Sequence, residues 1–265
     1  MELKIEGVYN IRDLGGLPAA GGMKVKTGKL IRSGELSAVT PAGIERLNRI
    51  GVSDIIDLRT INEVRELPDI DIPDTVYTHI SMLEVPERGI SHEGESSAPD
   101  TAQLFIDSVK QMNMDVPAAM NGMYDEILDS EYSGHAFRKF FDILLSAEGA
   151  ALFHCTAGKD RTGICAIYVL GLLGVPRDII LDDCEMSDRC LRPQTEDIVS
   201  RVAKINDDPE LLRQVRILNS VLPEYAENIF GRIDERGGIE KFLEERSGIG
   251  REEREELRRK LLGRR

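Results

Sequence analysis

His-Cys-Thr-Ala-Gly-Lys-Asp-Arg-Thr-Gly, residues 154–163, is the stretch on which the interpretation of this chain depends. The apolar residues 150–153 before it predict a short buried strand, and the apolar run 164–173 after it predicts a buried helix. Cys155 is therefore expected at the end of a strand, one tight loop before a helix N-terminus. Arg161 follows Cys155 after five intervening residues, far enough for the loop to curl around one small anion.

These two side chains match what covalent cleavage of a phosphate ester requires. A free thiol is mostly protonated at neutral pH, but a helix N-terminus and surrounding backbone N–H groups stabilise the nucleophilic thiolate. Cys155 is accordingly the predicted nucleophile. The planar guanidinium of Arg161 can bind two phosphoryl oxygens and stabilise the charge of the transition state. The sequence thus predicts a cysteinyl-phosphate intermediate.

The other loop residues are assigned to phosphate binding. Ala157 and Gly158 are small, which lets the backbone approach the phosphate oxygens. Thr162 is expected to donate its hydroxyl to the thiolate when the intermediate is hydrolysed. The predicted phosphate-binding set is Thr156, Ala157, Gly158, Lys159 and Thr162. His154 is expected beneath the loop, where it would bind backbone and orient Cys155.

The overall composition limits the kinds of partner. The net charge of the 265 residues is −13, which disfavours nucleic acid and anionic membranes as partners. Residues 258–265 are basic and are expected to complement a helix dipole, with a membrane or nucleic-acid contact as the alternative. No apolar run is long enough to predict membrane insertion. Four dispersed cysteines favour a reducing cytoplasm, although secretion by a non-classical route is not excluded.

The order of predicted elements favours an α/β fold with a central, mostly parallel sheet flanked by helices. Strands are expected at 8–11, 52–58, 76–82 and 150–153, with a small hairpin at 24–31. Helices are expected at 41–50, 61–67, 101–129 with an interruption near Pro117, 133–148 and 164–173. From Pro176 the pattern is helical, with breaks near Pro193, Pro223, 237–238 and 248–250. We expect one domain, 1–265, with a helical C-terminal flank at 191–265.

Residues 84–130 are predicted to form a lid over the loop. A polar loop at 88–100 and helical segments are inserted just before the helix that leads into the 150–153 strand. Three charged residues, Arg12, Asp13 and Arg59, either line the edge of the pocket or form buried ion pairs, and the sequence leaves both roles open.

The 154–163 stretch resembles the active-site loop of the cysteine-dependent protein tyrosine phosphatase superfamily. It is most similar to a bacterial and fungal branch whose loop is His-Cys-x-Ala-Gly-Lys-Asp-Arg-Thr-Gly. Three upstream runs also resemble that branch: 10–16 (NIRDLGG), 30–36 (LIRSGEL) and 56–60 (IDLRT) with Glu63. The resemblance spans roughly residues 8–190.

The resemblance implies a phosphatase-like α/β fold, no metal or other cofactor, and inorganic phosphate as a product. It also implies a broad substrate range, from phosphotyrosine to phosphoserine, phosphothreonine and phosphoinositides. Lys159 adds positive charge that suits a multiply phosphorylated headgroup, whereas pairing with Asp160 or another carboxylate is its alternative role. A phosphorylated protein and a phosphoinositide therefore both stay open as substrates.

The general acid is the least defined member of the site. In the superfamily it is usually an aspartate on a separate loop, and the nearest match here by position is Glu84, after the 76–82 strand. Asp160, within the loop, is favoured because it cannot lie far from the phosphate and because nearby negative charge favours a protonated carboxyl. The predicted catalytic residues are Cys155, Arg161 and Asp160.

Two other functions fit part of the pattern. A phosphopeptide or phosphoinositide binding module without turnover usually lacks the cysteine or the arginine, and both are present here. A sulfurtransferase or arsenate reductase can share a cysteine at a strand-to-helix loop, but the run 159–163 argues against it. The favoured function is a phosphoric monoester hydrolase, a tyrosine phosphatase of broad specificity, with the binding module as the alternative.

Overall fold

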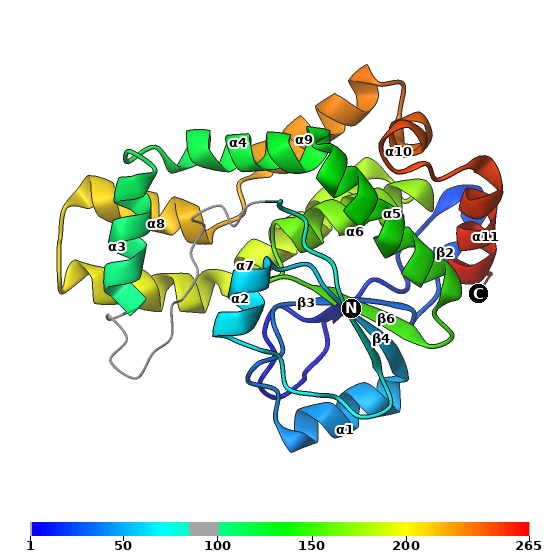
Figure 1. The fold of residues 1–265 in the computed structure, drawn as a ribbon, viewed down its shortest axis with the longest axis horizontal. Coiled ribbons are helices and arrows are strands. Elements are labelled where there is room, and N and C mark those ends of the chain that lie inside the picture. The colour runs from blue at the N-terminus through cyan, green and yellow to red at the C-terminus, as the bar shows by residue number, and fades with distance from the viewer. Residues whose placement is uncertain (1, 85–100, 265) are drawn as a thin grey trace.

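The computed structural model describes residues 2–84 and 101–264, and a five-stranded sheet lies at its centre (Figure 1). The strands are β1 (Arg12–Asp13), β3 (Leu30–Ser33), β4 (Val52–Asp57), β5 (Val76–His79) and β6 (Ala150–His154). Their order across the sheet is β1-β3-β6-β4-β5. β1 is antiparallel to β3, and the other neighbouring pairs are parallel. The predicted mostly parallel sheet is confirmed.

Helices flank this sheet, as the α/β prediction requires. Those connected most directly to the strands are α1 (Pro41–Ile50), α2 (Ile61–Glu66), α5 (Glu131–Ser146) and α6 (Arg161–Leu172). The others are α3 (Thr101–Gln111), α4 (Val116–Asp129), α7 (Arg177–Ala203), α8 (Pro209–Asn219), α9 (Pro223–Glu235), α10 (Ile239–Ser247) and α11 (Arg251–Leu261). α3 packs on α7 and α8, and α4 packs on α5, α8 and α9.

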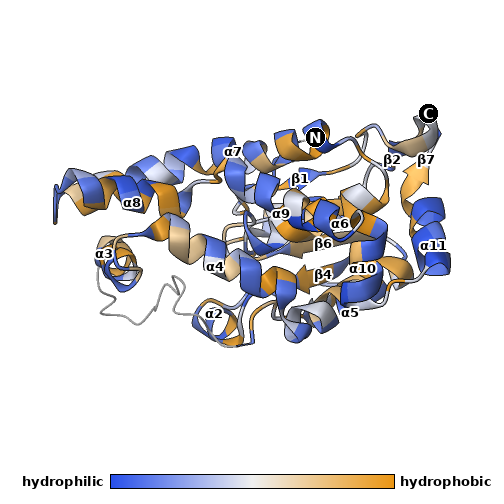
Figure 2. Ribbon diagram, turned by 90° about the horizontal axis from the view of Figure 1, so that it is seen from above, coloured by the Kyte–Doolittle hydropathy of each residue, from blue (hydrophilic) through white to orange (hydrophobic). Residues whose placement is uncertain are grey.

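The central strands of the sheet are buried on both faces, whereas the edge strand β5 is partly exposed. Successive side chains of a strand point to opposite faces, so β3 and β6 each contribute to two apolar cores. Leu30 and Phe153 belong to the larger core, which includes α5 and α6. Ile31 and Leu152 belong to a smaller core, which includes α1. Figure 2 accordingly shows the central strands β4 and β6 as hydrophobic.

The register places the ends of the parallel strands at one edge of the sheet. Ser33, the last residue of β3, pairs with His154 at the end of β6. His154 also pairs with Asp57, the last residue of β4, which in turn pairs with His79 at the end of β5. Loops that follow carboxyl ends of parallel strands meet at a common crevice, which is where ligands bind in open α/β sheets.

Two predicted strand features near the N-terminus are wrong. The hairpin at 24–31 does not form, because β2 (Lys24–Val25) pairs instead with β7 (Leu262–Gly263), while β3 enters the central sheet. The strand expected at 8–11 lies at 12–13, because Asn10 adopts a φ of 53° that interrupts an extended backbone. The first error reflects a partner far away in sequence, and the second reflects a local backbone conformation.

The helical C-terminal part differs from the predicted pattern in two places: a helix runs through Pro193, and an unpredicted break lies at 204–208, between α7 and α8. α7 continues through Pro193 to Ala203, although a proline removes one hydrogen bond from a helix interior. Buried residues on both sides, including Cys184 and Val199, pack into the core and outweigh that loss. The polar loop expected at 88–100 lies outside the described residues.

Candidate active site

Cys155 lies at the sheet edge described above. β6 ends at His154, α6 begins at Arg161, and residues 155–160 between them form what we call the Cys155 loop. Cys155 is 2% exposed. The structure therefore places the predicted nucleophile between a buried strand and the N-terminus of an apolar helix.

Arg161 is fixed by a carboxylate that the sequence singled out only as part of a resemblance. Its Nη1 donates to Glu63 Oε2 at 2.6 Å and its Nη2 donates to Oε1 at 2.7 Å. Thr156 Oγ1 also donates to Glu63. Burial raises the pKa of Glu63, but the Arg161 guanidinium and these hydrogen bonds lower it to about 2. Glu63 is therefore an ionised anchor for the arginine.

Glu63 is itself held by the start of α2. The backbone N–H of Thr60 donates to Glu63 Oε2 at 2.8 Å, and the Glu63 N–H donates to Thr60 Oγ1. This reciprocal capping box was readable from the spacing of Thr60 and Glu63. The second role of Glu63, towards Arg161, depends on a contact between distant segments and has no local signal.

Asp160 contacts donors from the loop and from α4. Tyr124 Oη donates to Asp160 Oδ1 at 2.7 Å, and Lys159 Nζ lies 3.0 Å from Oδ2. Burial, followed by the charge of Asp160, raises the pKa of Tyr124, so its hydroxyl remains a donor. Tyr124 packs against Tyr225 of α9 with 5.1 Å between ring centroids. Through Tyr124, the described part of the predicted lid thus contacts the Cys155 loop. Of the two roles considered for Lys159, the structure shows pairing with Asp160.

Thr162 and Glu84, two further residues considered for the site, lie in different surroundings. Thr162 is fully buried at the start of α6, and its hydroxyl has no hydrogen-bond partner within the described residues. Glu84 is exposed, and it makes no hydrogen bond or ion pair with the Cys155 loop in the part of the chain that is described. Asp160 is itself part of the loop, whereas Glu84 has no such contact with it among the described residues.

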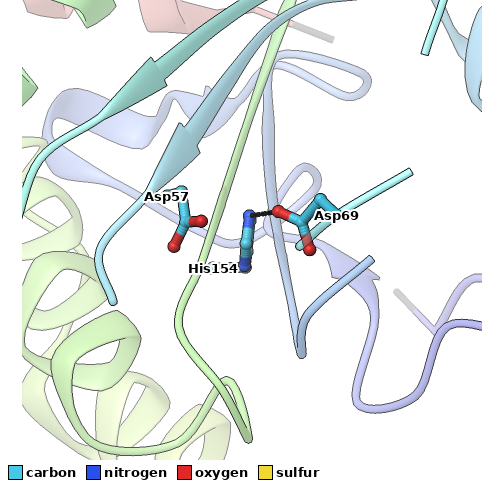
Figure 3. A group of neighbouring side chains, drawn as sticks. All are labelled: Asp57, Asp69 and His154. Carbon is cyan, nitrogen blue, oxygen red and sulfur yellow. Dashed lines mark ion pairs between the residues drawn. The ribbon is translucent and has the colours of Figure 1, made fainter. Parts of the chain in front are cut away.

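His154 lies between two carboxylates beneath the loop (Figure 3). Its Nε2 lies 3.0 Å from Asp69 Oδ2, and its Nδ1 faces the Cys155 carbonyl oxygen at 3.2 Å. Burial lowers the pKa of His154, but Asp57 and Asp69 outweigh this and raise it overall. The imidazole ring thus lies directly behind the nucleophile, with both ring nitrogens facing oxygen atoms.

The same cluster is the place where a metal ion would be sought. Donor atoms of Asp57, Asp69 and His154 converge there. However, Arg59 Nη2 lies 2.7 Å from Asp57 and 3.0 Å from Asp69. Both carboxylates are therefore already paired with the buried Arg59, and the cluster is a buried ion-pair network. The sequence left two roles open for Arg59, at the pocket edge or in a buried ion pair, and the structure shows the buried ion pair.

Arg12 and Asp13 are also structural. Arg12 pairs with Asp183 of α7, with Nε 2.6 Å from Oδ1. The Asp13 carboxylate accepts hydrogen bonds from the backbone N–H groups of Gly15 and Gly28, both at 2.7 Å. These contacts fix the turns that lead into β3.

The basic C-terminal residues are engaged with the fold. Arg258 Nε donates to the Leu172 carbonyl at 2.9 Å, and Lys260 Nζ donates to the Leu145 carbonyl at 2.7 Å. These cations complement helix C-termini, as expected. Among the described helices, none is both long and apolar enough to cross a bilayer.

Comparison with known proteins agrees with this geometry. The chain is 30% identical to the triple specificity protein phosphatase PtpB of Mycobacterium tuberculosis, over 98% of this chain and 99% of that protein. It is 28% identical to a putative tyrosine-protein phosphatase of Cupriavidus necator, over 80% of this chain and 72% of that one. A tyrosine-protein phosphatase of Nostoc commune is 30% identical over 68% of this chain and 55% of its own length.

A family model described as the tyrosine phosphatase family matches residues 3–263, which is nearly the whole chain. The match includes the Cys155 loop, the Glu63 anchor and the helices that follow. The resemblance noted in the sequence is thereby confirmed, and the chain belongs to the tyrosine phosphatase family.

Proposed function

We propose that this chain hydrolyses phosphate monoesters through a cysteinyl-phosphate, and that phosphotyrosine in proteins is its principal substrate. The observation that carries the proposal is the buried Cys155 at the α6 N-terminus together with Arg161, one edge of which is fixed by Glu63. Arg161 Nε makes no hydrogen bond within the described residues. An unused edge of the guanidinium, Nε–H and one terminal N–H, is therefore left for two phosphoryl oxygens.

In the first step the Cys155 thiolate attacks phosphorus. The S–P bond forms while the P–O bond to the leaving group breaks, and Asp160, after taking up a proton from solvent, passes it to the leaving oxygen. Arg161 and the loop N–H groups hold the other phosphoryl oxygens as charge moves onto them.

In the second step water attacks the phosphoenzyme. It loses a proton to the Asp160 carboxylate, the S–P bond breaks, and inorganic phosphate leaves. The donors Tyr124 and Lys159 around Asp160 suit this ionised form. The departing sulfur can accept a hydrogen bond from Thr162, whose buried hydroxyl is otherwise unpartnered within the described chain. Neither step calls for a group beyond these side chains.

The substrate range is proposed to be broader than phosphotyrosine. The relative named as a triple specificity phosphatase favours a wide range, and on that ground we extend the proposal to phosphoserine, phosphothreonine and phosphoinositides. We further propose that residues 1–265 act as one phosphatase domain. The four free thiols suit a reducing compartment such as the cytoplasm.

Replacing Cys155 with serine is expected to abolish hydrolysis of p-nitrophenyl phosphate and of a phosphotyrosine peptide, because an alcohol at this position is not ionised. The measurement is steady-state turnover in EDTA, with Cys190→Ser on α7 as the matched control that keeps wild-type rates. Turnover by Cys155→Ser would contradict the mechanism. A wild-type protein that binds vanadate but hydrolyses neither ester would instead be a binding module. Release of phosphate from phosphoinositide vesicles, measured in parallel, tests the wider range.

Replacing Asp160 with asparagine is expected to slow hydrolysis more for a poor leaving group than for a good one. A proton from Asp160 matters most when the leaving oxygen is basic, so we expect a loss of about 100-fold or more for phosphotyrosine and a smaller loss for p-nitrophenyl phosphate. Glu84→Gln is the comparison. Asp160 loses its role as the acid if Glu84→Gln shows this leaving-group dependence and Asp160→Asn does not.

A further inference from the structure

Three successive carbonyl groups of the Cys155 loop are bound by the body of the protein. Tyr9 Oη donates to the Thr156 carbonyl oxygen at 2.8 Å. Asn10 Nδ2 donates to the next two carbonyl oxygens, those of Ala157 at 2.9 Å and Gly158 at 3.1 Å. Both donors come from a segment that lies almost 150 positions before the loop.

Two other groups support these contacts from β3 and from the residues after it. Arg32 Nη2 donates to the Gly158 carbonyl at 2.8 Å, and the Glu35 N–H donates to the Thr156 carbonyl at 3.0 Å. The Ala157 carbonyl, by contrast, has Asn10 as its donor among the described residues. Asn10 is thus the donor that spans the middle of the loop.

Holding these carbonyls fixes the direction of the N–H groups that follow. A peptide unit is planar, and its C=O and N–H point in opposite directions. The N–H groups of Ala157, Gly158 and Lys159 are therefore turned away from Tyr9 and Asn10. Within the described residues these three N–H groups donate to no protein acceptor. They form a set of donors that an oxyanion can use.

The Asn10 side chain has a single orientation available. Its Oδ1 accepts a hydrogen bond from Arg12 Nη1 at 2.6 Å, so its Nδ2 must face the loop. Asn10 is 5% exposed, and its φ of 53° is one that asparagine adopts more readily than most residues. Arg12 is in turn fixed by Asp183.

We propose that Asn10 and Tyr9 are positioning residues that preset the N–H groups of the Cys155 loop for the phosphoryl group by holding the loop carbonyls outward. The inference deepens the proposed function and rests on it. Without these donors a peptide unit of the loop can rotate and present a carbonyl oxygen, which repels a phosphoryl oxygen. The loss falls on oxyanion affinity and on the transition state, while the Cys155 and Arg161 side chains remain in place.

Asn10→Gly is the sharpest test because glycine keeps the positive φ and removes only the side chain. We expect a loss of about 100-fold in affinity for orthovanadate and in kcat/KM for p-nitrophenyl phosphate, comparable to the removal of an oxyanion donor. Asp74→Gly is the matched control, since Asp74 also has a positive φ, 63°, but is exposed and remote from the loop. Asn10→Asp, which keeps the shape but not the donor, is expected to behave like Asn10→Gly.

Tyr9→Phe tests the same proposal by removing a single hydroxyl, and it remains informative if Asn10→Gly does not fold. The expected loss of vanadate affinity is about tenfold, because Glu35 still holds the Thr156 carbonyl. Tyr168→Phe is the control, since the buried Tyr168 hydroxyl has no partner among the described residues. Folded Asn10→Gly and Tyr9→Phe variants with wild-type vanadate affinity would overturn the proposal. Vanadate binding can be measured without turnover, so failure of the proposed hydrolysis is a separate result.

Discussion

Replacing Arg161 with lysine is expected to lower kcat/KM for phosphate esters about 1000-fold, a loss of roughly 4 kcal/mol of transition-state stabilisation. Lysine can still pair with Glu63, so the fold is expected to survive. A single ammonium cannot, however, bind Glu63 with one edge and two phosphoryl oxygens with another, as the guanidinium can. The measurement is steady-state kinetics on p-nitrophenyl phosphate together with a thermal unfolding curve.

Two further variants test whether the loss is specific to the guanidinium of Arg161 and its anchor. Glu63→Gln keeps the arginine but weakens its anchor, so we expect an intermediate loss in kcat/KM. Arg177→Lys, which alters exposed pairs with Glu227 and Asp234, should leave the kinetics unchanged. An Arg161→Lys enzyme within tenfold of wild type would show that the planar, two-edged guanidinium is unnecessary.

Replacing Gly158 with alanine is expected to remove nearly all hydrolysis and to lower the melting temperature. Gly158 has a φ of +68°, and a Cβ there would lie 2.2 Å from the Ser33 carbonyl oxygen and 2.7 Å from the Gly34 nitrogen. Both neighbours are backbone atoms at the end of β3, so the Cys155 loop itself must move. We expect at least a 100-fold loss of kcat/KM, because the loop N–H groups would leave their positions around the phosphate.

Gly22→Ala is the matched control for this change. Gly22 has nearly the same φ, +69°, but nothing lies within 4 Å of the position that an alanine Cβ would occupy there. Gly22→Ala therefore has the cost of about 1–2 kcal/mol of placing an alanine at a positive φ, without the steric overlap. If both variants lose the same stability and Gly158→Ala retains activity, close approach of the loop to β3 is not what requires glycine there.

The position of the Cys155 loop between a strand and a helix could be predicted because its sequence signal is local. Cys155, Arg161 and the small residues between them occupy one continuous string, and the apolar runs around it identify the strand and the helix. The apolar run of β6 and the capped start of α1 are likewise written within a few neighbouring residues. These features reproduced the α/β class and the place of the loop in it.

The side chains that position the Cys155 loop and Arg161 could not be predicted, because each contacts them from a segment far away in the sequence. Glu63 lies 98 positions before Arg161, and Asn10 lies 147 positions before Ala157. Their sequence runs could be recognised as resembling a family, but no spacing rule connects them with the loop. The wrong hairpin at 24–31 has the same origin, since its actual partner lies near the other end of the sequence.

The pairing of β2 with β7 also constrains when the protein can finish folding during its synthesis. Lys24 and Gly263 are partners although more than two hundred residues lie between them. At a translation rate of ~5–20 residues per second, the N-terminal strand waits for tens of seconds before its partner exists. Lys26 must wait as well, since it donates to the Leu261 and Lys260 carbonyls. Throughout that interval the edge of β2 that pairs with β7 in the finished fold has no partner strand.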